Sequence, residues 1–233
     1  MTTVSLIRYQ KFTSQWWAFT QMGLAPRHLA QTEGLQFGRL MGSGGNDGFS
    51  IRPNFKVYAW LACWENKQAA DTFFTHHAWW QKAKSRSVEQ ITFFLQPTMA
   101  HGKWEGQNPF GKPTTYDPRQ PTAVLTRATI RTRKLPEFWR WVPKTSASIH
   151  DHPARLMSIG IGEYPIFMQA TFSLWESGKA MQEFAYRSKY HKEVVRLTRE
   201  RKWYKEELFA RFAVVGIAGN WAGIDTAKKF SEH

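Results

Sequence analysis

The sequence predicts an α+β fold made of two tandem units, each with the element order β-α-β-β-α-β. Two observations indicate it: the chain repeats itself, and strand-like and helix-like patterns follow the same order in both halves. This order is that of the ferredoxin-like unit, so two antiparallel sheets are expected to form a dimeric-α/β-barrel-type fold whose interior has room for a ligand. The matched segments are 16–19 with 138–141, 39–41 with 155–157, 64–73 with 175–184, and 102–106 with 219–223.

The elements are clearest in the second half. Alternating apolar residues such as Met168, Ala170 and Phe172 predict a strand, and the helical phase of Met181 and Phe184 predicts a helix. The expected elements in this half are strand 123–130, helix 136–148, strands 155–161 and 166–175, helix 178–201, short helix 203–212 and strand 213–218.

A stretch rich in Pro, Gly and Thr separates the two halves and is typical of a linker. The predicted organisation is a first ferredoxin-like unit at 1–106, a linker at 107–121 and a second unit at 122–233. The two units are expected to make one compact domain.

Composition excludes several classes of protein. Hydrophobic residues are 42% and aromatic residues 15% of the 233 residues, which excludes global disorder. The chain has no apolar run of membrane-spanning length, and its first residues lack the pattern of a signal peptide. A cytoplasmic protein is therefore expected. The single cysteine excludes an internal disulfide framework.

The charge balance is strongly basic, with 32 Lys and Arg against 18 Asp and Glu. Such a surface attracts nucleic acid, anionic lipid or an acidic protein, or it serves solubility alone. No nucleic-acid motif is present, and no P-loop, HExxH, CxxC or Ser-His-Asp order supports hydrolase chemistry. No nucleic-acid partner is expected.

Several short motifs have an ordinary structural interpretation. The glycine-rich segments 42–48 and 160–163 fail the spacing of a phosphate loop and are predicted to be hairpin loops. Residues 150–152, His-Asp-His, lack further metal ligands nearby, and the adjacent His76 and His77 point to different faces of a helix.

Cys63 has three interpretations: a haem thiolate, a nucleophile or a core residue. It alternates with Val57, Ala59 and Leu61 on the strand face expected beneath the helices. A buried free cysteine behaves as a small hydrophobe, so we expect a core residue.

His191 shares a predicted helix face with Phe184 and Val195 and is expected to point toward the sheet. On the residues alone, a hydrogen-bonded core histidine is the simpler interpretation. The repeat places Trp80 at the corresponding position of the first half, and this asymmetry suits a single cofactor per chain. The cations along 187–205 form either a solvated face or a docking patch.

Several segments resemble the spheroidene monooxygenase family of carotenoid biosynthesis. They are 48–50, 100–102, 123–130, 160–163, 169–176, 184–187 with His191 four residues on, and 203–212. The resemblance implies a monooxygenase that depends on b-type haem. It implies insertion of oxygen into an acyclic carotenoid, or a similar long apolar substrate, to give a keto product. Reduced ferredoxin is the implied electron donor.

The resemblance also implies roles for residues. His191 is the expected axial ligand of the haem iron, with His101 in reserve, and Arg187 is expected to pair with a propionate. Phe49, Trp60 and Phe167 are expected to line the pocket. No catalytic residue is assigned.

Other functions stay open. One is a haem enzyme with different chemistry on a small molecule, since this fold hosts varied reactions. Another is a basic module that binds membrane or nucleic acid without catalysis. For the oxygenase, the cationic surface is expected to dock on anionic lipid, peripheral to the inner membrane, or on an acidic ferredoxin. A homo-oligomer is a further possibility.

Overall fold

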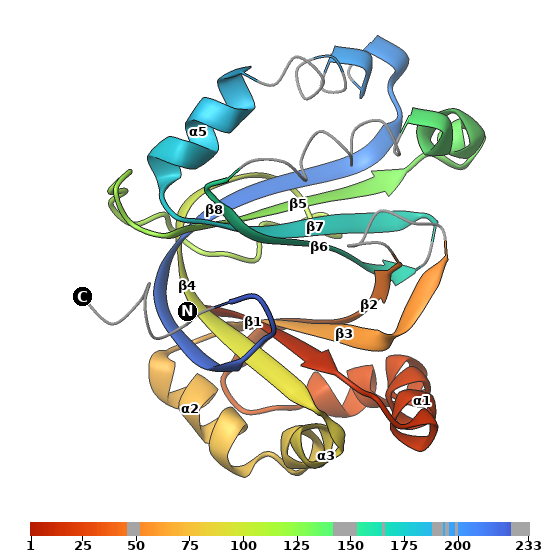
Figure 1. The fold of residues 1–233 in the computed structure, drawn as a ribbon, viewed down its shortest axis with the longest axis vertical. Helices are drawn as coiled ribbons and strands as arrows, with labels where there is room; N and C mark the ends of the chain where they lie inside the picture. The colour runs from red at the N-terminus through yellow and green to blue at the C-terminus, as the bar shows by residue number, and fades with distance from the viewer. Residues whose placement is uncertain are drawn as a thin grey trace.

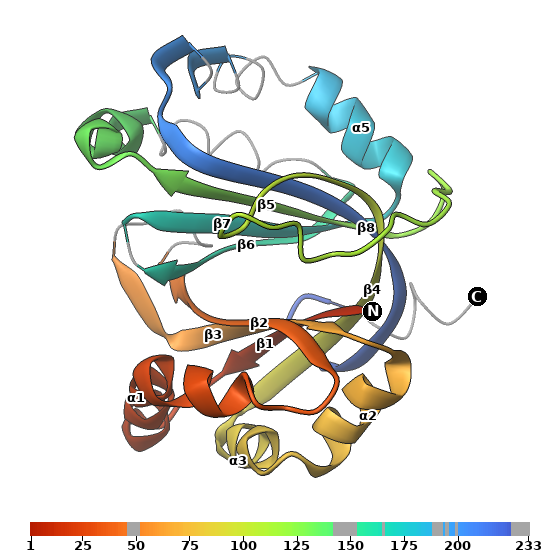
Figure 2. The same cartoon turned by 180° about the vertical axis from the view of Figure 1, so that it is seen from behind.

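The computed structural model describes residues 1–45, 52–141, 153–164, 166–187, 193, 196–198 and 200–224, with the side chain of residue 187 left out. Eight strands form a closed barrel, and helices cover its outside (Figures 1 and 2). The first half contains β1 (Thr2–Arg8), α1 (Phe12–Leu29), β2 (Leu35–Gly44), β3 (Pro53–Trp64), α2 (Lys67–His76), α3 (Ala78–Arg86) and β4 (Glu89–Gly102). The second contains β5 (Thr122–Ile130), η2 (Thr132–Lys134), helical residues 135–141, β6 (Arg155–Tyr164), β7 (Met168–Trp175), α5 (Gly178–Arg187) and β8 (Tyr204–Asn220).

The strand order is β1-β3-β2-β6-β7-β5-β8-β4, and each neighbouring pair is antiparallel. This confirms the predicted α+β fold with two ferredoxin-like units closed into one barrel. The two halves meet at two seams of unequal length. Strands β4 and β8 pair from Gln90–Asn220 to Gly102–Leu208, whereas β2 and β6 pair at Gly42–Gly162 and Ser43–Ile161.

Gly42–Gly44 and Gly160–Glu163 therefore lie in strands, and their prediction as hairpin loops is wrong, whereas Gly45 follows the end of β2. Gly42 belongs to β2 and Gly160–Glu163 to β6, and the two segments meet across the short seam. Residues 46–48 of the first segment lie outside the described residues. Glycine is unfavourable in a strand interior, but it permits close backbone approach.

The barrel interior is packed with apolar side chains from all eight strands, so the expected ligand space inside it is filled. Cys63 belongs to this interior cluster, as do Val57, Ala59 and Leu61, so the face predicted for them is wrong. The helices cover the alternate residues, such as Trp60 and Trp64. Both faces of β3 are apolar because both are buried, and alternation alone does not tell them apart.

Cys63 is nevertheless a core residue, as predicted. Burial raises the pKa of its thiol to about 11, so the thiol is protonated at neutral pH. A neutral buried thiol is a poor nucleophile and metal ligand.

The prediction of a short helix at 203–212 is wrong, because β8 begins at Tyr204. Glu206, Glu207, Leu208 and Ala210 favour a helix by propensity. In the fold this segment pairs with β5 on one side and β4 on the other, and its alternate residues Leu208 and Ala210 fill the barrel. Pairing on both edges overrides local propensity.

The repeat is clearest at the two Gly-x-Trp-x-Gly turns. Gly102 and Gly219 have positive φ values of +87° and +91°. A Cβ atom at Gly102 would collide with the carbonyl oxygen of Glu207, and one at Gly219 with that of Gln90. Each turn places its tryptophan, Trp104 or Trp221, into the barrel core.

Replacing Gly102 with alanine is expected to destabilise the fold by about 2–3 kcal/mol, because a left-handed backbone and a steric collision act together. Gly106 is the matched control, since its φ is +82° but its added Cβ meets open space. Gly106→Ala should therefore cost about 1 kcal/mol. Urea unfolding of both variants measures the difference, and equal losses would show that the collision is relieved.

Candidate functional site

A cleft of about 810 Å³ lies along β2, with α1 on one side of it. The cleft runs along the part of β2 before Gly42 and Ser43, the two residues that pair with β6. Along that part of β2, the described residues of β6 form no strand pairing. Residues Ile161–Tyr164, Ile166 and Gln169 close the opposite side. The volume is typical of pockets that hold small molecules or cofactors.

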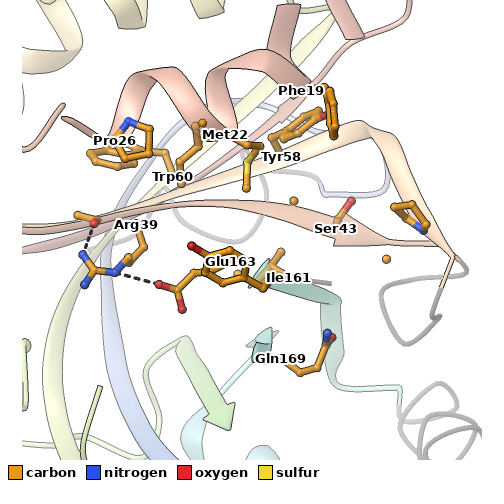
Figure 3. Close-up of a pocket in the computed structure, with 18 of the residues that line it drawn as sticks. Phe19, Met22, Pro26, Arg39, Ser43, Tyr58, Trp60, Ile161, Glu163 and Gln169 are labelled. Carbon is orange, nitrogen blue, oxygen red and sulfur yellow. Dashed lines mark hydrogen bonds and ion pairs between the residues drawn. The ribbon is translucent and has the colours of Figure 1, made fainter. Parts of the chain in front are cut away.

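One wall of the cleft is apolar. Met22 and Pro26 come from α1, and Tyr58 and Trp60 come from the outer face of β3 (Figure 3). The hydroxyl of Tyr58 and the Nε1–H of Trp60 are buried and have no hydrogen-bond partner in the structure described. Burial raises the pKa of Tyr58 to about 12, so its hydroxyl stays protonated and able to donate. Both groups are hydrogen-bond donors, but neither polar atom is exposed to the open cleft.

An ionic cluster lies at the other end of the cleft. Glu163 accepts from Arg39 at 2.9 Å (Figure 3) and from Arg127 at 3.4 Å, and the Trp104 indole donates to it at 3.2 Å. Arg127 is only 2% exposed and faces the barrel interior. Burial raises the pKa of Glu163, and the two guanidiniums offset only part of that shift.

Glu206 completes this cluster from β8. Its carboxylate binds Arg127 and accepts the backbone N–H groups of Glu105 and Gly106 at 3.0 and 2.9 Å. Burial raises the pKa of Glu206, but these hydrogen bonds and Arg127 outweigh it, so the net pKa is lowered. The Gly-x-Trp-x-Gly turn is thereby attached to β8 and β5.

Sequence reasoning missed Arg127, although a signal was present. Arg127 is separated from Leu125, and Leu125 from Ala123, by one residue of β5. A charged residue therefore lies on the apolar face of that strand. Leu6 is the corresponding residue of the first unit. Leu6 of β1 pairs with Ile91 of β4, just as Arg127 of β5 pairs with Leu208 of β8. Ile91 precedes Gly102 by the same number of residues as Leu208 precedes Gly219, so the two positions correspond in the repeat. One half therefore has a leucine where the other has a buried cation.

The two units also differ on the sheet faces beneath their helices. In the first unit, large side chains cover this face and pack against the helices. The strand registers match each large residue with a small or polar one in the second unit. The pairs are Trp60 with Thr171, Tyr58 with Gln169, Leu40 with Gly160, and Ile7 with Ala128. These registers place 39–41 on 159–161, so the sequence match of 39–41 with 155–157 is wrong.

Two separate apolar clusters support the helical layer of the second unit. One joins α5 to Trp175 and Phe209, and the other joins the 135–141 helix to Ile130 and Trp203. Thr171, Gly160 and Ala128 belong to neither cluster. Among the described residues, the middle of this sheet face therefore carries small or polar side chains where the first unit has large apolar ones.

The structure places the residues expected from sequence in different regions. Trp60 lines the cleft. Phe167 is 41% exposed and follows Ile166, which lines the cleft. His101 is exposed on β4 and stacks on Phe209, with ring centroids 5.3 Å apart.

The other residues singled out from the sequence lie outside the part of the chain that the structure describes. They are Phe49, His191, the side chain of Arg187, and the His-Asp-His segment at 150–152. Trp80, matched with His191 by the repeat, is a buried core residue. His77 lies against Phe73, and burial lowers its pKa.

Among the described residues, no three His, Cys, Asp or Glu side chains form a group suited to a metal ion. In the same part of the chain, no helix is long and apolar enough to cross a membrane.

Solved structures support the fold. Two crystal structures of aldoxime dehydratase, one in complex with butyraldoxime, match with a TM-score of 0.59 at 10% and 11% identity. Each match covers 91% of this chain, and 79% or 80% of the other. At this identity the likeness shows the fold alone.

Sequence relatives show the family, although no family profile matches the chain. The spheroidene monooxygenase of Rhodobacter capsulatus is 36% identical over 97% of this chain and 94% of its own length. The spheroidene monooxygenases of Cereibacter sphaeroides and Rubrivivax gelatinosus are 34% and 31% identical, over 96% and 82% of this chain and 69% and 73% of theirs. This chain therefore belongs to the spheroidene monooxygenase family.

Proposed function

We propose that this monooxygenase depends on haem and inserts oxygen into an acyclic carotenoid, or a similar long apolar molecule, to give a keto product. Family membership supports a carotenoid substrate. The observation that carries the haem proposal is the sheet face of the second unit, where Thr171, Gly160 and Ala128 stand in place of large residues.

In this proposal that face and the segment 178–201 would hold the haem between them. His191 would hold the haem iron through its imidazole nitrogen, and Arg187 would pair with a propionate, as a guanidinium suits a carboxylate. Bound haem supplies the activation of dioxygen, which side chains do not perform. The electrons come from reduced ferredoxin, and the basic surface of the protein favours an acidic donor.

The cleft beside α1 is proposed as the substrate pocket. Its apolar wall holds the hydrocarbon and excludes water. The rings of Tyr58 and Trp60 form part of that wall. Phe49 and Phe167 extend the apolar lining.

The absorption spectrum of protein purified from haem-supplemented cells tests the haem proposal. The wild type is expected to show a Soret band, and His191→Ala is expected to lose or shift it because the iron loses its axial nitrogen. His101→Ala is the matched control and should keep the wild-type spectrum.

The other outcomes discriminate between the candidate functions. A band unchanged in His191→Ala but lost in His101→Ala would move the axial ligand to His101. Absence of haem from the wild type, even after reconstitution, would contradict the haem proposal and favour the membrane- or nucleic-acid-binding module.

A further inference from the structure

Helix α1 has two apolar faces. Ala18, Ala25 and Leu29 are buried against the sheet. Phe12 and Trp16 point away from it and are 78% and 60% exposed. A helix that only covers a sheet needs one apolar stripe and a polar opposite face. The second face of α1 therefore requires a different explanation.

The exposed aromatic residues continue to the mouth of the cleft. The ring of Trp16 lies 5.9 Å from that of Phe19, and Phe19 lies 5.6 Å from Phe55 of β3. Phe19 and Phe55 both line the cleft, and Figure 3 shows Phe19 beside Met22 and Tyr58. We call Phe12, Trp16, Phe19 and Phe55 the aromatic rim. This rim joins an exposed surface to a binding cavity.

Basic residues lie on α1 and beside Phe55, and α1 itself has no acidic residue. Lys11, Arg27 and Lys56 are exposed, and α1 contains no Asp or Glu. Exposed tryptophan and phenylalanine beside lysine and arginine are typical of helices that lie in the interface of an anionic bilayer. The aromatic rings enter the headgroup region while the cations bind lipid phosphates.

We propose that the aromatic rim inserts into an anionic lipid bilayer and opens the cleft directly to the membrane. An apolar molecule then passes from the lipid into the cleft without crossing water. The proposal uses the proposed function only for the identity of that molecule. It places the membrane contact on α1, rather than on the cationic segment 187–205, for which the sequence leaves a solvated face and a docking patch as alternatives.

Flotation with phosphatidylcholine vesicles that contain phosphatidylglycerol tests the contact. Trp16→Glu is expected to weaken binding roughly tenfold or more, because the aromatic burial is lost and a charge enters the interface. Val215→Glu is the matched control, since Val215 is 48% exposed on β8, opposite β2 in the barrel order. This control should bind like the wild type.

Quenching by brominated lipids locates the contact. Trp16 fluorescence should be quenched in the bilayer, and Trp16→Phe should lose that quenching while it still binds vesicles. Equal binding by wild type and Trp16→Glu, or equal loss in Val215→Glu, would overturn the proposal. So would quenching that Trp16→Phe leaves unchanged.

Vesicle flotation and lipid quenching require neither bound haem nor catalytic turnover. A failure of the membrane proposal can therefore be told apart from a failure of the haem proposal. A colourless protein that binds vesicles through Trp16 would overturn the haem proposal alone. A haem-loaded protein that ignores vesicles would overturn the membrane proposal alone. Thermal unfolding of each variant confirms that the exposed substitutions leave the fold intact.

Discussion

Arg127→Leu is expected to lower the free energy of unfolding by about 3 kcal/mol, because it takes the buried cation away from Glu206 and leaves Glu163 with Arg39 alone. Arg127 is only 2% exposed and contacts both Glu163 and Glu206. Leucine is a fair test of packing, since Leu6 occupies the same place in the first unit. Urea unfolding gives the value.

The loss should depend on pH and on Glu163. Burial already raises the pKa of Glu163, and removal of Arg127 raises it further. A carboxyl with a raised pKa contributes its full stability below its unfolded pKa and loses it as the pH rises through the folded value. The deficit of Arg127→Leu should therefore shrink as the pH falls.

Two further variants distinguish the effect of the lost ion pairs from the effect of altered packing. Glu163→Gln in the Arg127→Leu background should recover part of the loss, because it removes a buried charge that has lost one of its two guanidinium partners. Arg119→Leu breaks a surface ion pair with Asp117 and should have no measurable effect. A deficit that is independent of pH and of Glu163 would show that the cluster acts through packing alone.

Thr171→Trp is expected to weaken haem binding by more than about tenfold, because the indole would fill the sheet face proposed for the haem. The first unit carries Trp60 at the corresponding position, so this fold accommodates a tryptophan there. Thr171→Val is the matched control, since it keeps the branched shape without adding bulk. Haem titration followed at the Soret band measures both variants.

If Thr171→Trp binds haem as tightly as the wild type, this placement of the haem is contradicted. The cleft beside α1 would then be the alternative site. Loss in both variants would indicate that the threonine hydroxyl matters, rather than the free space. Urea unfolding of Thr171→Trp provides the folding control, and a midpoint near that of the wild type is expected.

The fold was largely predictable because its signals are local and occur twice. Alternation marks the strands, and the repeated Gly-x-Trp-x-Gly turns have matching backbone geometry in the two halves. Predictions were wrong where pairing overrides local preference. The segment 203–212 has helix-favouring residues but pairs on both edges as β8.

The candidate site was less predictable because it depends on differences between the two halves. Trp60 was expected at a pocket and lines the cleft. The buried Arg127 and its partners Glu163 and Glu206 come from three strands that are distant in sequence. No spacing along the chain links those residues, because barrel closure brings them together.

The sequence by itself determined the repeat, the element order, the basic surface and the resemblance to a family. Each of these is a property of neighbouring residues or of composition. Only the tertiary structure decided which face of each strand is inside, where the cleft opens and which charges meet. Those features depend on the register between strands, and register is set by packing the whole barrel at once.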